Sequence, residues 1–216
     1  IAAFFFETYQ GWGAWFYPQN YIDKLHQLAK QNNILFCFDE VQSGFYRMGS
    51  LYGYMTYGDY EPDIICVGKG ITSSLPLSAL ISRKDIIDID PKANLSSTHA
   101  GNALCCAAGY ANLEFLTEPS FQRQLAETIS YFEKGCRDLL KYDTIKKVNV
   151  RGMIAGIIFH DVDTTNRIVE NCIKDGILMM QTKRESIKLG PPLTITIEAL
   201  QEVFEVLHEN IKKEIK

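Results

Sequence analysis

The chain has 216 residues, and its 22 Lys and Arg residues against 26 Asp and Glu residues give a formal net charge of −4. A surface that binds nucleic acid or an anionic membrane needs a basic excess, which this sequence lacks. The length allows one large domain or two small ones. We therefore predict a globular protein with no nucleic-acid partner and no membrane partner.

The six cysteines and the first residues bear on the cellular compartment. No Cys-x-x-Cys pair occurs, and most cysteines lie among apolar neighbours. Such thiols are typical of a reducing compartment, so we predict a cytoplasmic location. The apolar run 1–6 is too short to span a bilayer and lacks the basic flank of a signal peptide. Because the sequence opens directly on this run, without an initiator Met, we expect a missing upstream part.

The first half of the chain predicts alternating strands and helices. Residues 1–6 favour a buried strand and residues 34–38 a second strand. Residues 19–31 favour an amphipathic helix with one apolar face, made by Tyr21, Ile22, Leu25 and Leu28. Residues 63–67 and 77–82 are further short runs rich in Ile, Val and Leu. Strands that are apolar on both faces are expected where helices cover both sides of a parallel sheet. The pattern therefore predicts an α/β fold.

A domain boundary is predicted near residue 117. Residues 102–116 are dense in Ala, Cys and Leu and are followed by Glu118-Pro119, which indicates a closely packed helix and its end. The segment beyond predicts a smaller α+β domain. Its expected elements are helices over 120–142 and 164–175, strands over 146–150 and 153–160, two short strands, and a helix that begins at residue 197.

An apolar strand runs directly into two carboxylates and then into turn residues at 34–44 (ILFCFDEVQSG). Ligands of open α/β sheets bind beyond the carboxyl ends of the strands. An acid such as Asp39 in this place would hold a cation strongly, because water screens a charge poorly beside an apolar wall. The alternative is that Asp39 only caps the following turn.

A second apolar strand delivers a lysine between two glycines at 62–71 (PDIICVGKGI). There Lys69 would be partly desolvated, which lowers the pKa of an amine and favours the neutral form that attacks an aldehyde. Gly68 and Gly70 would allow a sharp turn and the close approach of a flat cofactor. A surface lysine on a turn is the alternative. A phosphate loop is excluded, because the longer glycine-rich loop before a Lys-Ser/Thr pair is absent.

The two segments together favour one cofactor. Asp39 and Lys69 are separated by 69 − 39 = 30 residues and follow two strands that should end at the same edge of one sheet. Pyridoxal phosphate requires such a pair, since a carboxylate keeps its pyridine nitrogen protonated and a lysine binds its aldehyde. The pair therefore predicts a pyridoxal-phosphate site.

Three segments in this order, 38–49 (FDEVQSGFYRMG), 61–64 (EPDI) and 68–70 (GKG), resemble the signature of the class III aminotransferases. This is the family of ornithine, acetylornithine and 4-aminobutyrate aminotransferases. The resemblance extends over essentially the whole chain, from residues 7–13 (ETYQGWG) to residues 191–196 (PPLTIT). Order, spacing and intervening residues agree, so the similarity does not depend on one short pattern.

The resemblance implies fold type I of the pyridoxal-phosphate enzymes. Residues 1–117 would be the C-terminal part of the large, mostly parallel-sheet domain, and residues 118–216 the small C-terminal α+β domain. It also implies an obligate homodimer with shared active sites. The family's N-terminal half has no counterpart in this sequence, so we expect a missing N-terminal half of the same polypeptide or a complementary chain.

The resemblance also implies roles for residues near the ring of the cofactor. Lys69 would form the Schiff base with pyridoxal 5'-phosphate and, once freed, would move a proton between substrate and cofactor carbons. Asp39 would pair with the pyridine nitrogen, Val41 would pack on the ring face, and Gln42 would lie near the ring hydroxyl. No metal is implied.

Residues 96–102 (SSTHAGN) resemble the family's segment that reaches the cofactor phosphate of the partner subunit. We assign this contact to Thr98, with Ser97 beside it, because free N–H groups at the start of a helix favour an anion. The alternative is that Thr98 or Ser97 is a plain helix N-cap. We interpret His99 as a packing or interface residue.

Two positions bear on the substrate. Glu7 begins a motif in which some relatives pair the glutamate with an arginine that would lie outside this sequence. Lys188 stands three residues before Pro191-Pro192, where the family commonly has a carboxylate-binding arginine. A lysine offers one point charge, whereas the guanidinium of an arginine binds both oxygens of a carboxylate. A substrate without an α-carboxylate, such as an amino sugar or a diamine, is therefore favoured. Arg184 is an alternative cation.

The function predicted from these features is amino-group transfer between an amine or amino acid and a carbonyl acceptor. A pyridoxal-phosphate racemase or aminomutase would share Asp39 and Lys69 and stays open as an alternative. A third possibility is a truncated domain that is not an enzyme and is retained for dimerisation.

Overall fold

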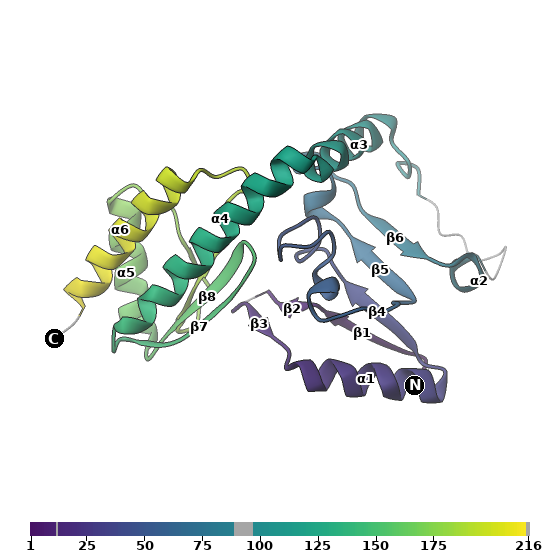
Figure 1. Ribbon diagram of the computed structural model, residues 1–216, viewed down its shortest axis with the longest axis horizontal. Helices are drawn as coiled ribbons and strands as arrows, with labels where there is room; N and C mark the ends of the chain where they lie inside the picture. The colour runs from purple at the N-terminus through teal and green to yellow at the C-terminus, as the bar shows by residue number, and fades with distance from the viewer. Residues whose placement is uncertain (12, 89–96, 215–216) are drawn as a thin grey trace. The chain divides into compact units, whose positions relative to one another are not determined.

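The structure is a computed structural model, which describes residues 1–11, 13–88 and 97–214 (Figure 1). The chain divides into two compact units. The predicted domain boundary after residue 117 stays a prediction. No helix within the described ranges is long and apolar enough to cross a membrane. Unit 1 comprises 1–8, 17–46 and 50–121, and unit 2 comprises 9–16, 47–49 and 122–216.

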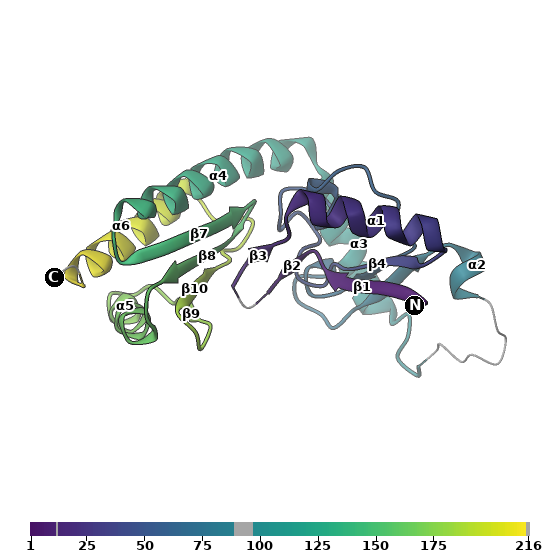
Figure 2. The same cartoon turned by 90° about the horizontal axis from the view of Figure 1, so that it is seen from below.

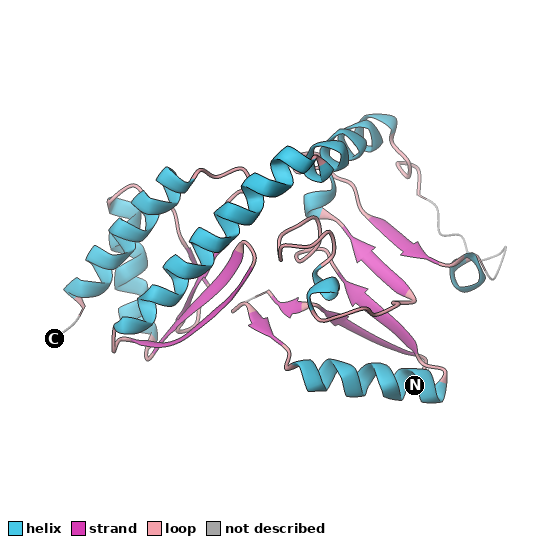
Figure 3. Ribbon diagram, in the orientation of Figure 1, coloured by secondary structure: helices cyan, strands magenta, loops and turns pink. Residues whose placement is uncertain are grey.

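Unit 1 is built on a four-stranded sheet with the order β1-β4-β5-β6, whose strands are labelled in Figure 1 and drawn in magenta in Figure 3. The strands are β1 (Ala3–Glu7), β4 (Leu35–Asp39), β5 (Ile64–Val67) and β6 (Ala79–Ser82). β1, β4 and β5 are parallel, whereas β6 is antiparallel to β5. The predicted α/β fold with a mostly parallel sheet is thereby confirmed, and the reversed direction of β6 was not predicted.

One face of this sheet is packed with aromatic rings. The ring of Phe36 lies 5.2 Å from that of Phe6 and 5.1 Å from that of Phe38 between centroids. Helix α1 (Gln19–Asn32) contributes His26, whose ring lies 5.1 Å from Phe36. Rings in edge-to-face contact add to the stabilisation from burial alone. This face therefore forms the core of unit 1.

Helix α1 buries only part of the predicted face. Ile22 and Ala29 are buried, whereas Tyr21 and Leu28, which we expected on the buried face, are 50% and 46% exposed. Residues 22, 26 and 29 follow helical spacing, so the buried stripe runs through His26. The helix ends at Asn33, whose backbone has the left-handed φ of 51°.

The other face of the unit 1 sheet is partly open. Phe5 on β1 is 57% exposed and Leu80 on β6 is 53% exposed. The expectation that 1–6 is a buried strand, and that helices cover both faces, is therefore wrong for the described chain. The physical reason is position, because β1 and β6 are the edge strands of this sheet.

The remaining elements of unit 1 are helices, each of which comes after one of its strands in the chain. Predicted helix 102–116 is confirmed as α3 (Ala103–Thr117), which begins at an N-cap where Asn102 accepts a hydrogen bond from the Cys105 N–H. The others are the single-turn helices η1 (Gly53–Thr56) and η2 (Lys69–Ile71), and the short helix α2 (Lys84–Ile87).

Unit 2 is an α+β unit on an antiparallel sheet with the order β7-β8-β10-β9. Every residue of β8 is buried, and α4 contacts α6 through Phe132 and Phe204, whose ring centroids are 6.1 Å apart. The predicted elements are confirmed with shifted ends (Figure 2). They are α4 (Pro119–Asp138), η3 (Leu139–Lys141), β7 (Ile145–Arg151), β8 (Ile154–Phe159), α5 (Val162–Lys174), β9 (Met180–Gln181), β10 (Ser186–Leu189) and α6 (Ile197–Lys213).

A short hairpin of unit 2 was not predicted. Strands β2 (Tyr9–Gln10) and β3 (Trp15–Phe16) pair antiparallel. Tyr9 and Ala14 form a buried cluster with Met48 and Ile154, against which Phe16 packs. The hairpin therefore joins the core of unit 2 although it follows β1 directly in sequence.

The turn between β7 and β8 requires a glycine. Gly152 has a φ of +61°, and a Cβ there would lie 2.4 Å from the carbonyl carbon of Met48. Its N–H donates to Glu133 Oε1 at 2.8 Å. We expect Gly152→Ala to lower the free energy of unfolding by about 3 kcal/mol, from left-handed strain and a backbone clash. Urea denaturation measures this change.

The matched control is Gly176→Ala. Gly176 also has a left-handed backbone, with a φ of +90°, but nothing lies within 4 Å of its Cβ position. This variant should lose only about 1 kcal/mol, from backbone strain alone. Equal losses in the two variants would show that the close approach of Met48 to Gly152 does not matter.

Candidate functional site

Two loops meet at the carboxyl edge of the unit 1 sheet. The Glu40 N–H donates to the Cys66 carbonyl at 2.8 Å, which extends the pairing of β4 and β5 beyond the strands. A Cβ at Gly68 would lie 3.5 Å from Val41 Cγ1, and one at Gly70 would lie 3.2 Å from Phe45 Cβ. The loop after β4 therefore packs directly on the glycines that flank Lys69.

Asp39 is half-buried at the end of β4. Its Oδ1 accepts a hydrogen bond from the Val41 N–H at 3.0 Å, so the expected turn cap is present. Within the described residues this is the only hydrogen bond of the Asp39 side chain, which leaves Oδ2 available to another partner. In the register of β4 and β5 Asp39 pairs with Cys66, and burial, followed by the charge of Asp39, raises the pKa of the Cys66 thiol.

Glu40, the neighbouring acid, has a different environment. Its side chain is fully buried, and Oε1 accepts hydrogen bonds from Thr8 Oγ1 at 2.5 Å and from the Tyr54 N–H at 2.8 Å. Oε2 accepts from Ser43 Oγ at 2.6 Å and from the Gly53 N–H at 2.7 Å. Glu40 thus ties the end of β1 and η1 to the loop after β4.

The charge of Glu40 also acts on nearby phenols. Burial, and then this charge, raises the pKa of Tyr52 and of Tyr54. Sequence reasoning noted two adjacent carboxylates but missed that one of them is structural. The available signal was strand alternation, which puts adjacent side chains on opposite faces.

Lys69 begins η2, directly after Gly68. Its side chain is exposed and its backbone has a left-handed φ of 42°. The expectation of partial desolvation is therefore wrong for the described chain, because Lys69 lies beyond the end of β5, in an exposed position. Asn112 of α3 fixes this turn, since its Nδ2 donates to the carbonyls of Gly70 at 2.8 Å and Ile71 at 3.2 Å.

The sheet register brings three of the predicted residues to one edge. Glu7 pairs with Asp39, and Asp39 pairs with Cys66. Lys69 lies 69 − 66 = 3 residues beyond Cys66. Both Glu7 and Gln42, which lies in the loop after β4, are half-buried. The arrangement presents carboxylates and an amine at the carboxyl ends of neighbouring parallel strands.

The segment before α3 differs from its prediction in one respect. Ser97 and Thr98 are exposed, and the N-cap of α3 is Asn102, so the alternative that Ser97 or Thr98 caps this helix is wrong. Ser97 O accepts the Ala100 N–H at 3.0 Å, which closes a turn over residues 97–100, before the cap at Asn102. His99 is exposed, so it is not a packing residue within this chain.

The two cations considered for substrate binding lie in unit 2. Lys188 is half-buried on β10, where it pairs with Gly156 of β8 and Met180 of β9. Arg184 is exposed between β9 and β10. Asp39 and Lys69 belong to unit 1.

Comparison with known proteins gives consistent matches. The family model for class III aminotransferases matches residues 1–211. Ornithine aminotransferase of Oceanobacillus iheyensis is 34% identical over 195 residues, covering 88% of this chain and 48% of the relative. Acetylornithine aminotransferase of Caldanaerobacter subterraneus is 30% identical over 197 residues, covering 91% and 49%. The chain thus spans about half the length of these curated relatives.

Solved structures of similar sequence also match. Ornithine delta-aminotransferase of Plasmodium falciparum has a TM-score of 0.89 at 27% identity, covering 99% of this chain and 55% of that chain. Acetylornithine aminotransferase of Elizabethkingia anophelis has a TM-score of 0.89 at 30% identity, covering 99% and 57%.

The four hydrogen bonds of Glu40 lead to a stability prediction. Glu40→Gln replaces one acceptor oxygen by an amide nitrogen that would face two donors. We expect the free energy of unfolding to fall by about 3 kcal/mol, from lost charge-assisted hydrogen bonds and an unsatisfied buried N–H. Urea denaturation followed by tyrosine fluorescence measures it.

The control for this prediction is Glu127→Gln, since Glu127 is exposed on α4. It should change stability by no more than about 0.5 kcal/mol. If both variants unfold at the same urea concentration, Glu40 does not hold the loop together.

Proposed function

The chain belongs to the class III aminotransferases, and from this premise we propose that the protein moves an amino group between an aliphatic amine and a carbonyl acceptor, using Lys69 and Asp39. The single observation that carries this proposal is the convergence of the two residues at adjacent parallel strand ends. The family is pyridoxal-phosphate-dependent. When bound, that cofactor supplies the electron sink for the amine carbon.

The residues at this edge fit such a group. Asp39 has one carboxylate oxygen without a hydrogen bond among the described residues, as a partner of a protonated ring nitrogen needs. Gly68 leaves open a surface bordered by Val41, whose methyl groups lie 3.5 and 3.7 Å from the Cβ position. We propose that Val41 packs on the ring face, that Gln42 lies near the ring hydroxyl, and that Asp39 keeps the ring nitrogen protonated.

Thr98 and Ser97 are proposed to bind the phosphate. Their exposure supports this role, because their hydroxyls are accessible to a ligand or a second subunit. A hydroxyl donates a hydrogen bond to a phosphate oxygen without adding charge. The contact would orient the phosphate group of the cofactor, while Asp39 would bind the nitrogen of its ring.

Lys69 is proposed to act in two ways. Its amine would hold the aldehyde carbon of the cofactor in the resting protein, and after release it would move a proton to or from the substrate carbon. The turn fixed by Asn112 supports this, because it holds the backbone beside the lysine while Lys69 itself is exposed.

Substrate binding is proposed for Glu7 and Lys188. Glu7 stands beside Asp39 in the sheet register, at the same edge. Lys188 would attract an anionic group as a point charge, without the geometric selection of a guanidinium. The relatives are named for ornithine, acetylornithine and 2-aminoadipate, which share an aliphatic amine. We therefore propose an aliphatic amine as donor, with weak selection for an α-carboxylate.

We further propose that two copies of the chain associate through α3. Its residues 103–113 contain no charged side chain, yet Leu104 and Tyr110 are 69% and 66% exposed. A helix that is apolar all round is usually covered by another part of the protein or by a partner.

A cytoplasmic location and a further part of the polypeptide stay predictions.

The test of the amine-transfer proposal is cofactor mapping. After incubation with pyridoxal phosphate and reduction with borohydride, mass spectrometry should find the added mass on Lys69. Lys69→Ala should lower transamination by about 10²–10⁴-fold, because it removes the group that moves the proton. Lys24→Ala, at an exposed position of α1, is the control and should keep full activity. Added mass on other lysines only would refute the assignment.

The test of the association proposal is solution mass. Leu104→Glu should raise the dissociation constant of the dimer about tenfold or more, since it replaces a large apolar contact by a charge. Light scattering over a dilution series measures the shift. Leu178→Glu is the control, because Leu178 is 89% exposed in unit 2. A native protein that is a monomer, or an equal shift in the control, contradicts the role of α3.

A further inference from the structure

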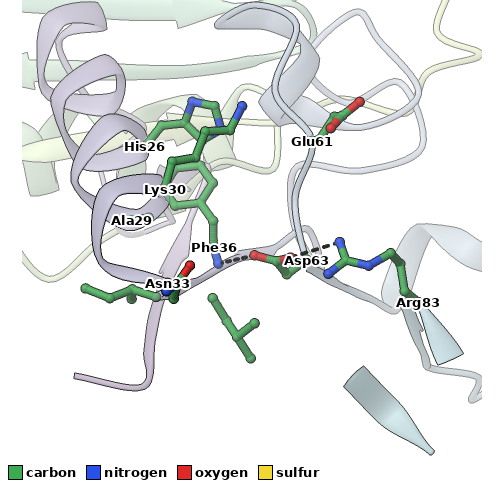
Figure 4. Close-up of a pocket in the computed structure, with 10 residues that line it drawn as sticks. His26, Ala29, Lys30, Asn33, Phe36, Glu61, Asp63 and Arg83 are labelled. Carbon is green, nitrogen blue, oxygen red and sulfur yellow. Dashed lines mark hydrogen bonds and ion pairs between the residues drawn. The ribbon is translucent and has the colours of Figure 1, made fainter. Parts of the chain in front are cut away.

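A recess lies at the opposite edge of the unit 1 sheet, where β4 and β5 begin (Figure 4). It has a volume of about 350 Å³, in the range of small-molecule sites. Its walls come from the last turns of α1, the start of β4, the segment before β5 and the end of β6. Because β4 separates it from Asp39, this recess is distinct from the edge that carries Lys69.

The floor of the recess carries the ion pair of Asp63 and Arg83, and Arg83 also pairs with Asp85, with 3.4 Å between Nε and Oδ1. Asp63 Oδ2 accepts the Phe36 N–H at 2.8 Å, and its Oδ1 accepts from Arg83 Nη1 at 3.0 Å. Both carboxylate oxygens are therefore engaged. Arg83 is exposed, and its Nη2 has no hydrogen bond among the described residues, so it can still donate to a ligand.

Two charges on the walls are left without an ion pair. Lys30 of α1 and Glu61 before β5 both line the recess and are exposed. Neither makes a hydrogen bond or a salt bridge within the described part of the chain. One positive and one negative group thus face the same space from different elements.

An unpaired ring nitrogen belongs to a third residue of the lining, which lies beside Lys30 in Figure 4. His26 Nε2 is buried and has no hydrogen-bond partner in the described residues. The ring is held by Phe36, at 5.1 Å, and by Tyr60, at 4.9 Å between centroids. Burial and then the charge of Lys30 lower the pKa of His26, whereas Asp23, Asp63 and Glu61 raise it. A neutral imidazole in this place offers a hydrogen bond without a charge.

These groups select a molecule that carries both charges. A simple anion would be attracted by Lys30 and repelled by Glu61, and a simple cation would meet the reverse. A molecule with one anionic and one cationic end satisfies both, and its carbon atoms can contact Ala29, Leu35 and the Phe36 ring. Charge complementarity of this kind sets specificity more than affinity.

We propose that this recess binds a zwitterionic amino acid, with its carboxylate on Lys30 and Arg83 and its ammonium group on Glu61. It is a second binding site, separate from the amine-transfer site.

The test is a binding titration of the Lys69→Ala protein without pyridoxal phosphate, so that neither the proposed Schiff-base lysine nor the cofactor aldehyde can react with the added amino acid. The probes are L-alanine, propionate and ethylamine, which share a carbon frame of similar size and differ in charge. Ligand-observed NMR should show L-alanine binding, with propionate and ethylamine at least about fivefold weaker. Equal binding of propionate and L-alanine would show that the recess binds a carboxylate alone, and this result would overturn the proposal.

Variants locate the binding. Lys30→Gln and Glu61→Gln should each weaken L-alanine binding about tenfold, through loss of one charge-assisted hydrogen bond. Lys24→Gln, exposed on the same helix as Lys30, and Glu127→Gln on α4 are the controls and should bind normally. No binding of L-alanine, or binding that is unchanged by Glu61→Gln, overturns the proposal. Because Lys69 is absent throughout, failure of the amine-transfer assignment leaves this result unaffected.

Discussion

The buried carboxylate of Glu40 is the interaction on which the candidate site depends. Its four donors come from the end of β1, from the loop after β4 and from η1, so a single charge holds three segments of unit 1. A carboxylate without water must have its hydrogen bonds supplied by the protein, and here all of them are. The loop that carries Val41 and Phe45 is thereby fixed against the glycines on either side of Lys69.

This arrangement separates the tasks of two adjacent acids. Strand geometry sends the side chains of Asp39 and Glu40 in different directions, and their surroundings then differ. Glu40 is fully buried and fully hydrogen-bonded, so it has no capacity for a ligand. Asp39 caps the turn with one oxygen and keeps the other, beside the thiol of Cys66. Glu40 therefore holds the loop in place, and one carboxylate oxygen of Asp39 remains available at the sheet edge.

The sequence predicted the strands and helices whose apolar spacing is strong, such as β4, β5, α5 and α6. It also predicted that Asp39 and Lys69 share a sheet edge, because parallel strands present their carboxyl ends together. It did not predict the direction of β6 or the β2-β3 hairpin, since both depend on long-range pairing with little local signal. The exposure of Lys69 and the role of Glu40 were missed for a related reason, as each is decided by side chains distant in sequence. The start of α3 was predicted to within one residue, and this start excludes the alternative of an N-cap at Thr98, which lies four residues before Asn102.

The central claim is that one planar ligand is held from two neighbouring strand ends, by a carboxylate on one and an amine on the other. Crystals of the protein grown with pyridoxal phosphate test it most directly. The account predicts continuous density from Lys69 Nζ to the aldehyde carbon, with Asp39 Oδ2 within hydrogen-bond distance of the ring nitrogen. Density for the ring elsewhere, or with Asp39 turned away from it, would contradict the account.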